Sequence, residues 1–239
     1  MNGPMADFRV DPSPRWVRVF FAGTAVGDSK RMRLLYEPGK LPLYCFPEAD
    51  VRTDLLSPGG KPNTFTLSAG GRSAKDAAWR FEAPELQGLV AFDWNAMDNW
   101  YEEDDEIFVH PRDPYKRVDV LRSTRHVQVI LGGEVVANSH RPSLLFETHL
   151  PVRYYLPHGD VRMDLLTLSD THTRCPYKGV ASYWSATVNG RTWKDVVWSY
   201  PVPIPECPKV EQLLCFFNER VDAIHVDGQA ESKPVTKWS

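Results

Sequence analysis

Residues 171–184, with the sequence THTRCPYKGVASYW, hold a thiol, an amine, an imidazole, two phenols and an indole. Cys175 is the nucleophile of this stretch, and Lys178 or His172 could stabilise its thiolate, as covalent or redox chemistry would require. A single cysteine is more often a small buried apolar residue. Catalysis by Cys175 and plain packing of its side chain are therefore both open.

A tight turn is expected where Pro176 and Gly179 bracket Tyr177 and Lys178, and such a turn displays both side chains. A lysine ammonium suits a phosphate or a carboxylate, although an ordinary solvated lysine is the alternative. Arg153, in the run VRYYLP, is a second candidate, because a guanidinium can grip an anionic group with two parallel hydrogen bonds. Tyr155 in the same run is included with it as a ligand-binding candidate.

The element that must position these side chains is a hairpin. Asn189-Gly190 tolerates the positive φ angles of a type I′ turn and predicts strands over residues 182–188 and 191–200. Aromatic residues of this hairpin could form a wall that stacks on a planar or cationic ligand, and core packing is the competing interpretation. They are Tyr183, Trp184, Trp198 and Tyr200, with Trp193 nearby.

An internal repeat makes the stretch specific to one half of the chain. Residues 17–56 match residues 127–166 at 17 of 40 positions, at an offset of 110. The offset then changes to 119, so nine residues of the second half, within the CPYKG region, have no equivalent in the segment 57–66. A site built on CPYKG is therefore expected once per chain.

The repeat also separates side chains found only in the second half from side chains found in both halves. Arg153 aligns with Leu43, and Tyr183 has no aromatic counterpart, so both are specific to the second half. Arg162 and Asp164 recur as Arg52 and Asp54, and two residues that are two apart share a strand face. We expect a structural pair there, and keep Arg162 as a ligand-binding candidate beside it.

Five segments follow from these patterns: a flexible leader (1–15), a first repeat domain that is degenerate because it lacks CPYKG (16–101), an ordered connector (102–125), a second repeat domain with the candidate site (126–228) and a tail (229–239). The connector begins with an acidic run, expected to be a solvated surface. Two prolines then stiffen it. Its His110 and Arg112 are further ligand-binding candidates.

The composition favours short strands and tight turns, with 8 Trp, 9 Tyr, 11 Phe and 20 Pro in 239 residues. Apolar runs at 34–36, 43–46 and 51–56 predict strands. No stretch of twelve or more residues has convincing helical periodicity, and 209–217 is ambiguous between a short helix and a strand. We predict an all-β chain of two tandem, related, small antiparallel domains with little helix.

Charge and cysteine content exclude several classes. The net charge is -3, so neither nucleic acid nor a membrane surface is an expected partner. No apolar run is long enough to span a bilayer, and we expect a cytoplasmic protein. The four cysteines form no C-x-x-C pair and the histidines lack metal-ligand spacing, so no metal and no cofactor are expected. The oligomeric state is open.

The chain resembles the family called Domain of Unknown Function 427, in its tandem form. The motifs are WYEEDDEIFVHPRDPYKRVDVL, RYYLPHGDVRMDLL, TRCPYKGVASYW and VVWSYPVPIPE followed by FFNERVD. The resemblance implies domains of the β-tent type, in which two antiparallel sheets lean together over an aromatic-lined pocket. It also carries a nucleotidyltransferase-like label, with no established reaction. Many β-tent proteins have paired C-x-x-C zinc sites, which this sequence lacks.

Three functions follow as hypotheses. The leading one is binding of a small anionic or aromatic metabolite, such as a nucleotide, in a pocket of the second domain, with the first domain as a scaffold. The alternative is an enzyme that uses Cys175 or Lys178, with nucleotidyltransferase-like chemistry as one option. The third is a structural or interaction module.

Overall fold

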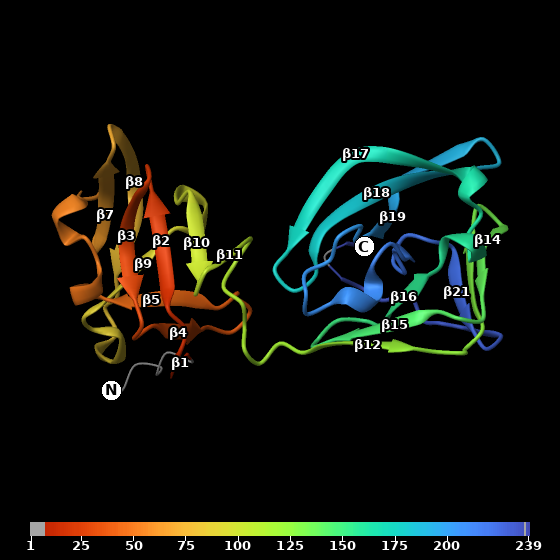
Figure 1. Ribbon diagram of the computed structural model, residues 1–239, viewed down its shortest axis with the longest axis horizontal. Helices are drawn as coiled ribbons and strands as arrows, with labels where there is room; N and C mark the ends of the chain where they lie inside the picture. The colour runs from red at the N-terminus through yellow and green to blue at the C-terminus, as the bar shows by residue number, and fades with distance from the viewer. Residues whose placement is uncertain (1–7, 237) are drawn as a thin grey trace, which may run out of the picture. The chain divides into compact units, whose positions relative to one another are not determined.

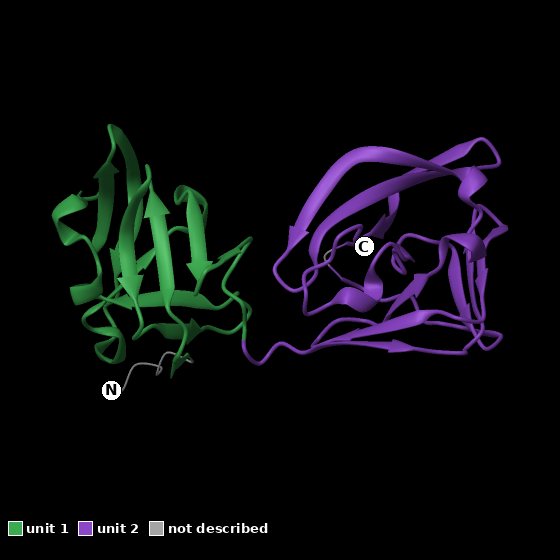
Figure 2. Ribbon diagram, viewed as in Figure 1, with its two compact units in different colours: residues 1–113 green, residues 114–239 purple. Residues whose placement is uncertain are grey.

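The computed structural model describes residues 8–236 and 238–239, and the chain forms two compact units. Unit 1 is Met1–Asp113 and unit 2 is Pro114–Ser239 (Figure 2). Both are built of antiparallel strands and short 3-10 turns, with no α-helix in the described residues. The prediction of an all-β chain with two related antiparallel domains is confirmed. None of the helical segments described has the length and hydropathy to cross a membrane.

Unit 1 contains a seven-stranded and a four-stranded sheet (Figure 1). The order in the larger sheet is β1 (Arg9–Pro12), β4 (Arg33–Tyr36), β5 (Leu43–Pro47), β9 (Leu89–Phe92), β8 (Arg72–Arg80), β7 (Thr64–Ala69) and β6 (Leu56–Pro58). The order in the smaller sheet is β11 (Asp105–Ile107), β10 (Asn99–Glu102), β2 (Val17–Phe21) and β3 (Thr24–Ser29). The 3-10 turns are η1 (Glu48–Asp50), η2 (Thr53–Leu55), η3 (Pro84–Leu86) and η4 (Trp94–Ala96).

Unit 2 repeats this topology strand for strand. Its larger sheet runs β12 (Val118–Arg122), β15 (Ser143–Glu147), β16 (Arg153–Leu156), β20 (Leu214–Phe216), β19 (Arg191–Ser199), β18 (Gly179–Val188) and β17 (Leu166–Cys175). Its smaller sheet runs β14 (Glu134–Ser139), β13 (Val127–Leu131), β21 (Ala223–Val226) and β22 (Gln229–Ala230). The turns are η5 (His158–Asp160), η6 (Met163–Leu165) and η7 (Pro208–Val210).

The repeat extends further toward the N-terminus than sequence identity indicated. Val10 of β1 pairs with Leu35, as Val120 of β12 pairs with Leu145. Part of the stretch expected to be a leader therefore forms an edge strand, and its residues 1–7 lie outside the described part of the chain. Only Val10 keeps its residue type within β1, which left the equivalence invisible to an identity search.

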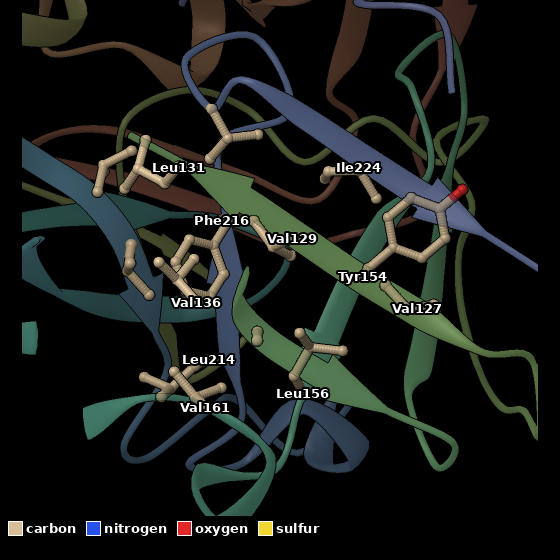
Figure 3. Packing of buried hydrophobic residues seen from close by; sticks show 14 of the residues in the cluster. Val127, Val129, Leu131, Val136, Tyr154, Leu156, Val161, Leu214, Phe216 and Ile224 are labelled. Atoms are coloured by element: carbon tan, nitrogen blue, oxygen red, sulfur yellow. The ribbon is translucent and has the colours of Figure 1, made fainter. Parts of the chain in front are cut away.

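The core of unit 2 lies between its two sheets. Alternate residues of β13 point inward, and Val127, Val129 and Leu131 are almost fully buried. They pack against Leu156 and Phe216 of the larger sheet (Figure 3). The pattern of buried and half-buried residues in β2 of unit 1 is the same, as expected for one fold used twice.

The strands expected at 34–36 and 43–46 are confirmed, and the strand expected at 51–56 is wrong. A 3-10 turn occupies Thr53–Leu55, and β6 begins only at Leu56. Residues 51–56 read VRTDLL, and a segment this short with three apolar residues carries too little periodicity to distinguish a strand from a 3-10 turn. Between β18 and β19, Asn189 has φ 49° and Gly190 has φ 76°, which confirms the predicted hairpin turn.

Candidate functional site

The two faces of the larger sheet of unit 2 bury different side chains. Leu144 and Tyr154 face the core, whereas the next residues, Leu145 and Tyr155, face away from it. A second cluster covers this opposite face, and we call it the aromatic cluster. Its buried members are Val120, Leu145, Tyr155, Ala181, Trp198, Tyr200, Cys207, Val210, Cys215 and Phe217, with Val118, Cys175, Tyr183, Ile204, Leu213 and Trp238 packed against them.

The segment found only in the second half lengthens one hairpin. Strands β17 and β18 each have 10 residues, against 3 in β6 and 6 in β7 of unit 1. The long hairpin forms an arch in Figure 1. Its tip begins where Cys175 pairs with Gly179. The backbone of Ile204 donates to the carbonyl of Lys178 at 3.1 Å, which fixes the tip against the segment that follows β19.

At this tip, two ammonium groups share one carboxylate. Lys178 Nζ lies 2.6 Å from Glu147 Oε2, and Lys116 Nζ lies 3.1 Å from Glu147 Oε1. The side chains of Lys178 and Glu147 are only 10% and 8% exposed. Burial alone would raise the pKa of Glu147, but the two lysines outweigh it and hold that pKa below its usual value. The centre keeps one positive charge in excess.

Lys178 stays protonated in this setting. Burial alone would lower its pKa, but the nearby Cys175 and Glu147, which accepts a hydrogen bond from Lys178, raise it. An amine acts as a nucleophile only when it is deprotonated. The position therefore suits Lys178 as a fixed charge or hydrogen-bond donor, and does not suit it as an attacking group.

Cys175 differs from the other cysteines in its surroundings. It is half-buried at the end of β17, beside the ammonium of Lys178. Burial raises the pKa of Cys45 to about 12 and that of Cys207 to about 11, and it also raises the pKa of Cys215. Those three remain thiols, and Cys175 is the one cysteine of the described residues that is not buried.

The other charged centre of the aromatic cluster is a buried ion pair between Arg153 and Glu219. Arg153 Nη1 and Nη2 each donate to Glu219 at 2.7 Å, and the two side chains are 8% and 0% exposed. Burial alone would raise the pKa of Glu219, and the bonds from Arg153 and Thr236 instead lower it. The two Arg153 donors that were expected to bind an external anion therefore bind the carboxylate of Glu219.

Two indole rings lie close to this guanidinium. Arg153 Cζ lies 5.6 Å from the ring centre of Trp198 and 5.4 Å from that of Trp238. Trp198 Nε1 also donates to the hydroxyl of Tyr155 at 3.0 Å. Phe217 packs on Trp198 at 4.4 Å and stacks on Tyr183 at 6.5 Å between ring centres. The face thus combines planar rings with two charged centres.

Seven predicted site residues meet in or beside the aromatic cluster. These are Arg153, Tyr155, Cys175, Lys178, Tyr183, Trp198 and Tyr200. Tyr177, in the turn, lies near them, with Lys116 5.9 Å from its ring centre.

The remaining predicted residues lie elsewhere. Trp184 packs on the core face beside His158, and Trp193 also packs there, so the hairpin aromatics do not form one wall. His172 is exposed on β17 and contacts the carbonyl of Asp170. His110 and Arg112 belong to unit 1.

Arg162 is also outside the cluster, on the surface of unit 2. It pairs with Asp164 through bonds of 2.8 and 2.7 Å, and Arg52 pairs identically with Asp54. The predicted structural pair is therefore confirmed in both halves. It spans a 3-10 turn, however, and not a strand face, because the sequence run was wrongly assigned to a strand.

Sequence reasoning missed Glu147, Lys116, Glu219 and Trp238. Glu147 recurs as Glu37 in the repeat, which made it look common to both halves, yet Glu37 bonds Lys40 in unit 1. Glu219 lies 66 residues from Arg153, and only its place in the motif FFNERVD singled it out. Lys116 was part of the connector, without a visible partner.

In unit 1 the equivalent face is apolar. Leu43, Cys45 and Phe81 stand where unit 2 has Arg153, Tyr155 and Tyr200. They pack with Leu35, Leu86 and Leu89. The guanidinium of Arg153 and the phenols of Tyr155 and Tyr200 are therefore specific to unit 2, although the strands that carry them are common to both units.

Unit 1 does have an open depression of about 330 Å³, lined by Arg31, Arg33, Pro47, Glu85, Gln87 and Leu89. Arg31 bonds Asp50, which also accepts from Ser29. The same network recurs in unit 2 as Arg141, Asp160 and Ser139. A network present in both units indicates a structural role, so the depression is a weaker candidate than the aromatic cluster.

Within the described ranges 8–236 and 238–239, no three His, Cys, Asp or Glu side chains converge as metal ligands.

Comparison with known proteins gives one family. The family described as "Domain of unknown function (DUF427)" matches residues 9–103 and 119–227. The two matched segments begin at the equivalent strands β1 and β12, so the family unit and the structural repeat coincide. No curated protein matches the chain.

Proposed function

The chain belongs to the DUF427 family, with one member segment in each unit, and from this premise we propose that unit 2 binds a small aromatic anion at the aromatic cluster. Lys116 and Lys178 would attract its negative group, and Tyr177, Tyr183 and Trp198 would contact its ring. Unit 1 acts as a scaffold. One ligand is bound per chain.

The observation that carries this proposal is the pairing of two lysines with one carboxylate at the hairpin tip of unit 2. In unit 2, two lysines share the single carboxylate of Glu147, so one positive charge remains at the hairpin tip. In unit 1, the residues equivalent to Arg153, Tyr155 and Tyr200 are Leu43, Cys45 and Phe81, and the segment of Lys178 has no equivalent. Burying an ammonium is costly unless it is paired, and a fold that stabilises two of them at one place supports a role in anion recognition.

The ring preference follows from the side chains around this charge. Tyr183 stacks on Phe217, and Trp198 lies beside both. Such rings favour planar partners through stacked or edge-on packing. A nucleoside monophosphate and a hydroxylated aromatic carboxylate both combine a planar ring with an anionic group.

The test is a calorimetric titration with adenosine 5′-monophosphate, uridine 5′-monophosphate and 4-hydroxybenzoate, with adenosine as the uncharged comparison. We expect an anion to bind with a stoichiometry near one per chain and more tightly than adenosine. Lys178→Met should weaken binding about tenfold or more, since about 1.4 kcal/mol corresponds to each factor of ten.

Lys194→Ala provides the matched control, because Lys194 is an exposed lysine of the same unit, outside the aromatic cluster. It should leave the affinity unchanged. Equal losses in both variants would indicate nonspecific charge attraction, and binding of none of the three anions would refute the proposal for these ligand classes.

A second candidate function is catalysis by Cys175, favoured by the ammonium of Lys178 beside its sulfur. A thiolate formed there could attack an electrophilic carbon or phosphorus, and nucleotidyltransferase-like chemistry is one version of this. Cys175→Ser separates the two functions. A binder should keep its affinity, whereas an enzyme that uses this nucleophile should lose turnover.

A further inference from the structure

We propose that residues 234–236 and 238–239 form a lid that occupies the binding face of unit 2 and must leave it before the ligand binds. This inference rests on the proposed function, since it concerns the regulation of the same site. The lid contacts the rest of unit 2 through Thr236 and Trp238, and Trp238 packs against the aromatic cluster. In Figure 1, the chain end lies beneath the β17–β18 arch.

The contacts of the lid converge on the Arg153–Glu219 pair. Thr236 Oγ1 donates to Glu219 Oε1 at 2.6 Å. The ring centre of Trp238 lies 5.4 Å from the guanidinium carbon of Arg153, and that of Trp198 lies 5.6 Å from it. The lid therefore places a planar ring and a hydroxyl donor on the two charged groups of this pair.

These two side chains resemble a ligand in their chemistry. An aromatic ring that stacks on Arg153 and a hydroxyl that donates to Glu219 could come equally from a ribose-bearing base or from a phenol. The lid lacks a described anionic contact to Lys178 or Lys116. A ligand with an anionic group can bind these lysines, which the lid does not do. This additional interaction favours displacement of the lid by the ligand.

The lid is attached through an exposed stretch. Residues 229–233 are exposed, and Val235 is 94% exposed. Within the lid, the amide of Thr236 donates to the hydroxyl of Ser239, and the hydroxyl of Thr236 donates to Glu219. A segment that is reached through an exposed stretch opens at much lower free energy than the sheet beneath it.

The first test measures how far the lid protects Arg153, without any ligand. Phenylglyoxal modifies accessible guanidinium groups, and peptide mass spectrometry gives the rate at each arginine. Arg162 is the internal control, because it makes the same two-bond pair with a carboxylate but is exposed. Arg153 should react slowly in the full-length wild-type chain and about tenfold faster in Trp238→Ala and Thr236→Ala, while Arg162 keeps its rate.

If Arg153 reacts with phenylglyoxal as slowly in both variants as in the wild-type chain, the lid proposal is refuted. The thermal midpoint separates a lid from a structural element. Trp238→Ala should shift the midpoint by a few degrees at most, whereas Trp198→Ala, which empties a buried position, should lower it strongly. A comparable loss in the two variants would show that Trp238 belongs to the permanent core and would also overturn the lid.

The second test uses adenosine 5′-monophosphate and 4-hydroxybenzoate as probes. Affinity is reduced by the fraction of molecules whose site is open, so Trp238→Ala should bind whichever probe binds the wild-type chain about tenfold more tightly. Equal or weaker binding by the variant would contradict displacement of the lid. If neither probe binds either protein, the proposed function fails for these probes. The rates of phenylglyoxal modification at Arg153 then still show whether the lid covers this residue.

Discussion

Lys178 donates a 2.6 Å hydrogen bond to Glu147, and this bond joins the tip of the longest hairpin of unit 2 to the second strand of the same sheet. The two residues are 31 positions apart in the chain and occupy nearly opposite ends of the strand order. Their contact is possible because the sheet curves and because β17 and β18 are longer than their counterparts in unit 1.

Replacing Lys178 by Met should destabilise unit 2 by about 2 to 3 kcal/mol, because Glu147 would stay buried with Lys116 as its remaining cationic partner. Urea denaturation followed by tryptophan fluorescence measures the change. Arg162→Ala breaks an exposed ion pair and should change stability little. If both variants unfold at the same urea concentration, the buried pair is not the stabilising contact.

Acid should weaken unit 2 through Glu147. The pKa of this carboxyl is lower in the folded chain than its usual value near 4.5, so folding releases protons there. Its stabilisation is present above about pH 4.5 and is lost as the pH falls through the folded pKa. Glu147→Gln should reduce the slope of unfolding free energy against pH between about pH 5 and pH 3. An unchanged slope would show that this carboxyl is not the linked group.

Alkaline conditions should also weaken unit 2, through Lys178, because its contribution is lost as the pH rises. Its pKa is raised in the folded chain, so the contribution is complete below the usual value of 10.5 and is lost as the pH rises through the folded pKa. The thermal midpoint of the wild-type chain should fall in this range by more than that of Lys178→Met. Parallel curves for the two proteins would exclude Lys178 as the titrating group.

Iodoacetamide should modify Cys175 before any other cysteine. Burial raises the pKa of Cys207 to about 11 and that of Cys45 to about 12, so both are almost entirely thiols at pH 8. Peptide mapping by mass spectrometry gives the rate at each site. Earlier modification of Cys207 or Cys45 would contradict this account.

The Arg153–Glu219 pair can be tested with the residue found in unit 1. Arg153→Leu should cost about 3 to 5 kcal/mol, since it leaves a buried carboxylate without its cation. Adding Glu219→Leu removes that charge, so the double variant should be less destabilised than the sum of the two single variants. Additive losses in urea denaturation would mean that the two side chains are not energetically coupled.

Much of the fold could be predicted from local pattern and from the repeat. Asn189-Gly190 specified a hairpin turn, and equivalent residues in the two halves predicted the common topology. The run before Leu56 was assigned to a strand in error, because a short apolar run does not distinguish a strand from a 3-10 turn. Edge strand β1 was missed because only Val10 of its residues recurs.

The location of the candidate site could be predicted from the sequence, but the residues that pair with its charged side chains could not. The repeat singled out the CPYKG turn and Arg153, both of which contact the aromatic cluster. Glu147 and Glu219 could not be inferred, because long-range pairing of charges depends on how the sheet curves. Trp184 was assigned to the same wall as Tyr183, but adjacent residues of a strand face opposite sides.

The most direct test of one binding site, in unit 2, is amide NMR mapping on the full-length chain with the probe that binds in calorimetry. We expect shifts at residues 175–183 and around Lys116 and Glu147, and none at the shorter hairpin of unit 1, residues 58–65. Shifts of equal size in the two hairpins, or shifts confined to unit 1, would contradict the proposal.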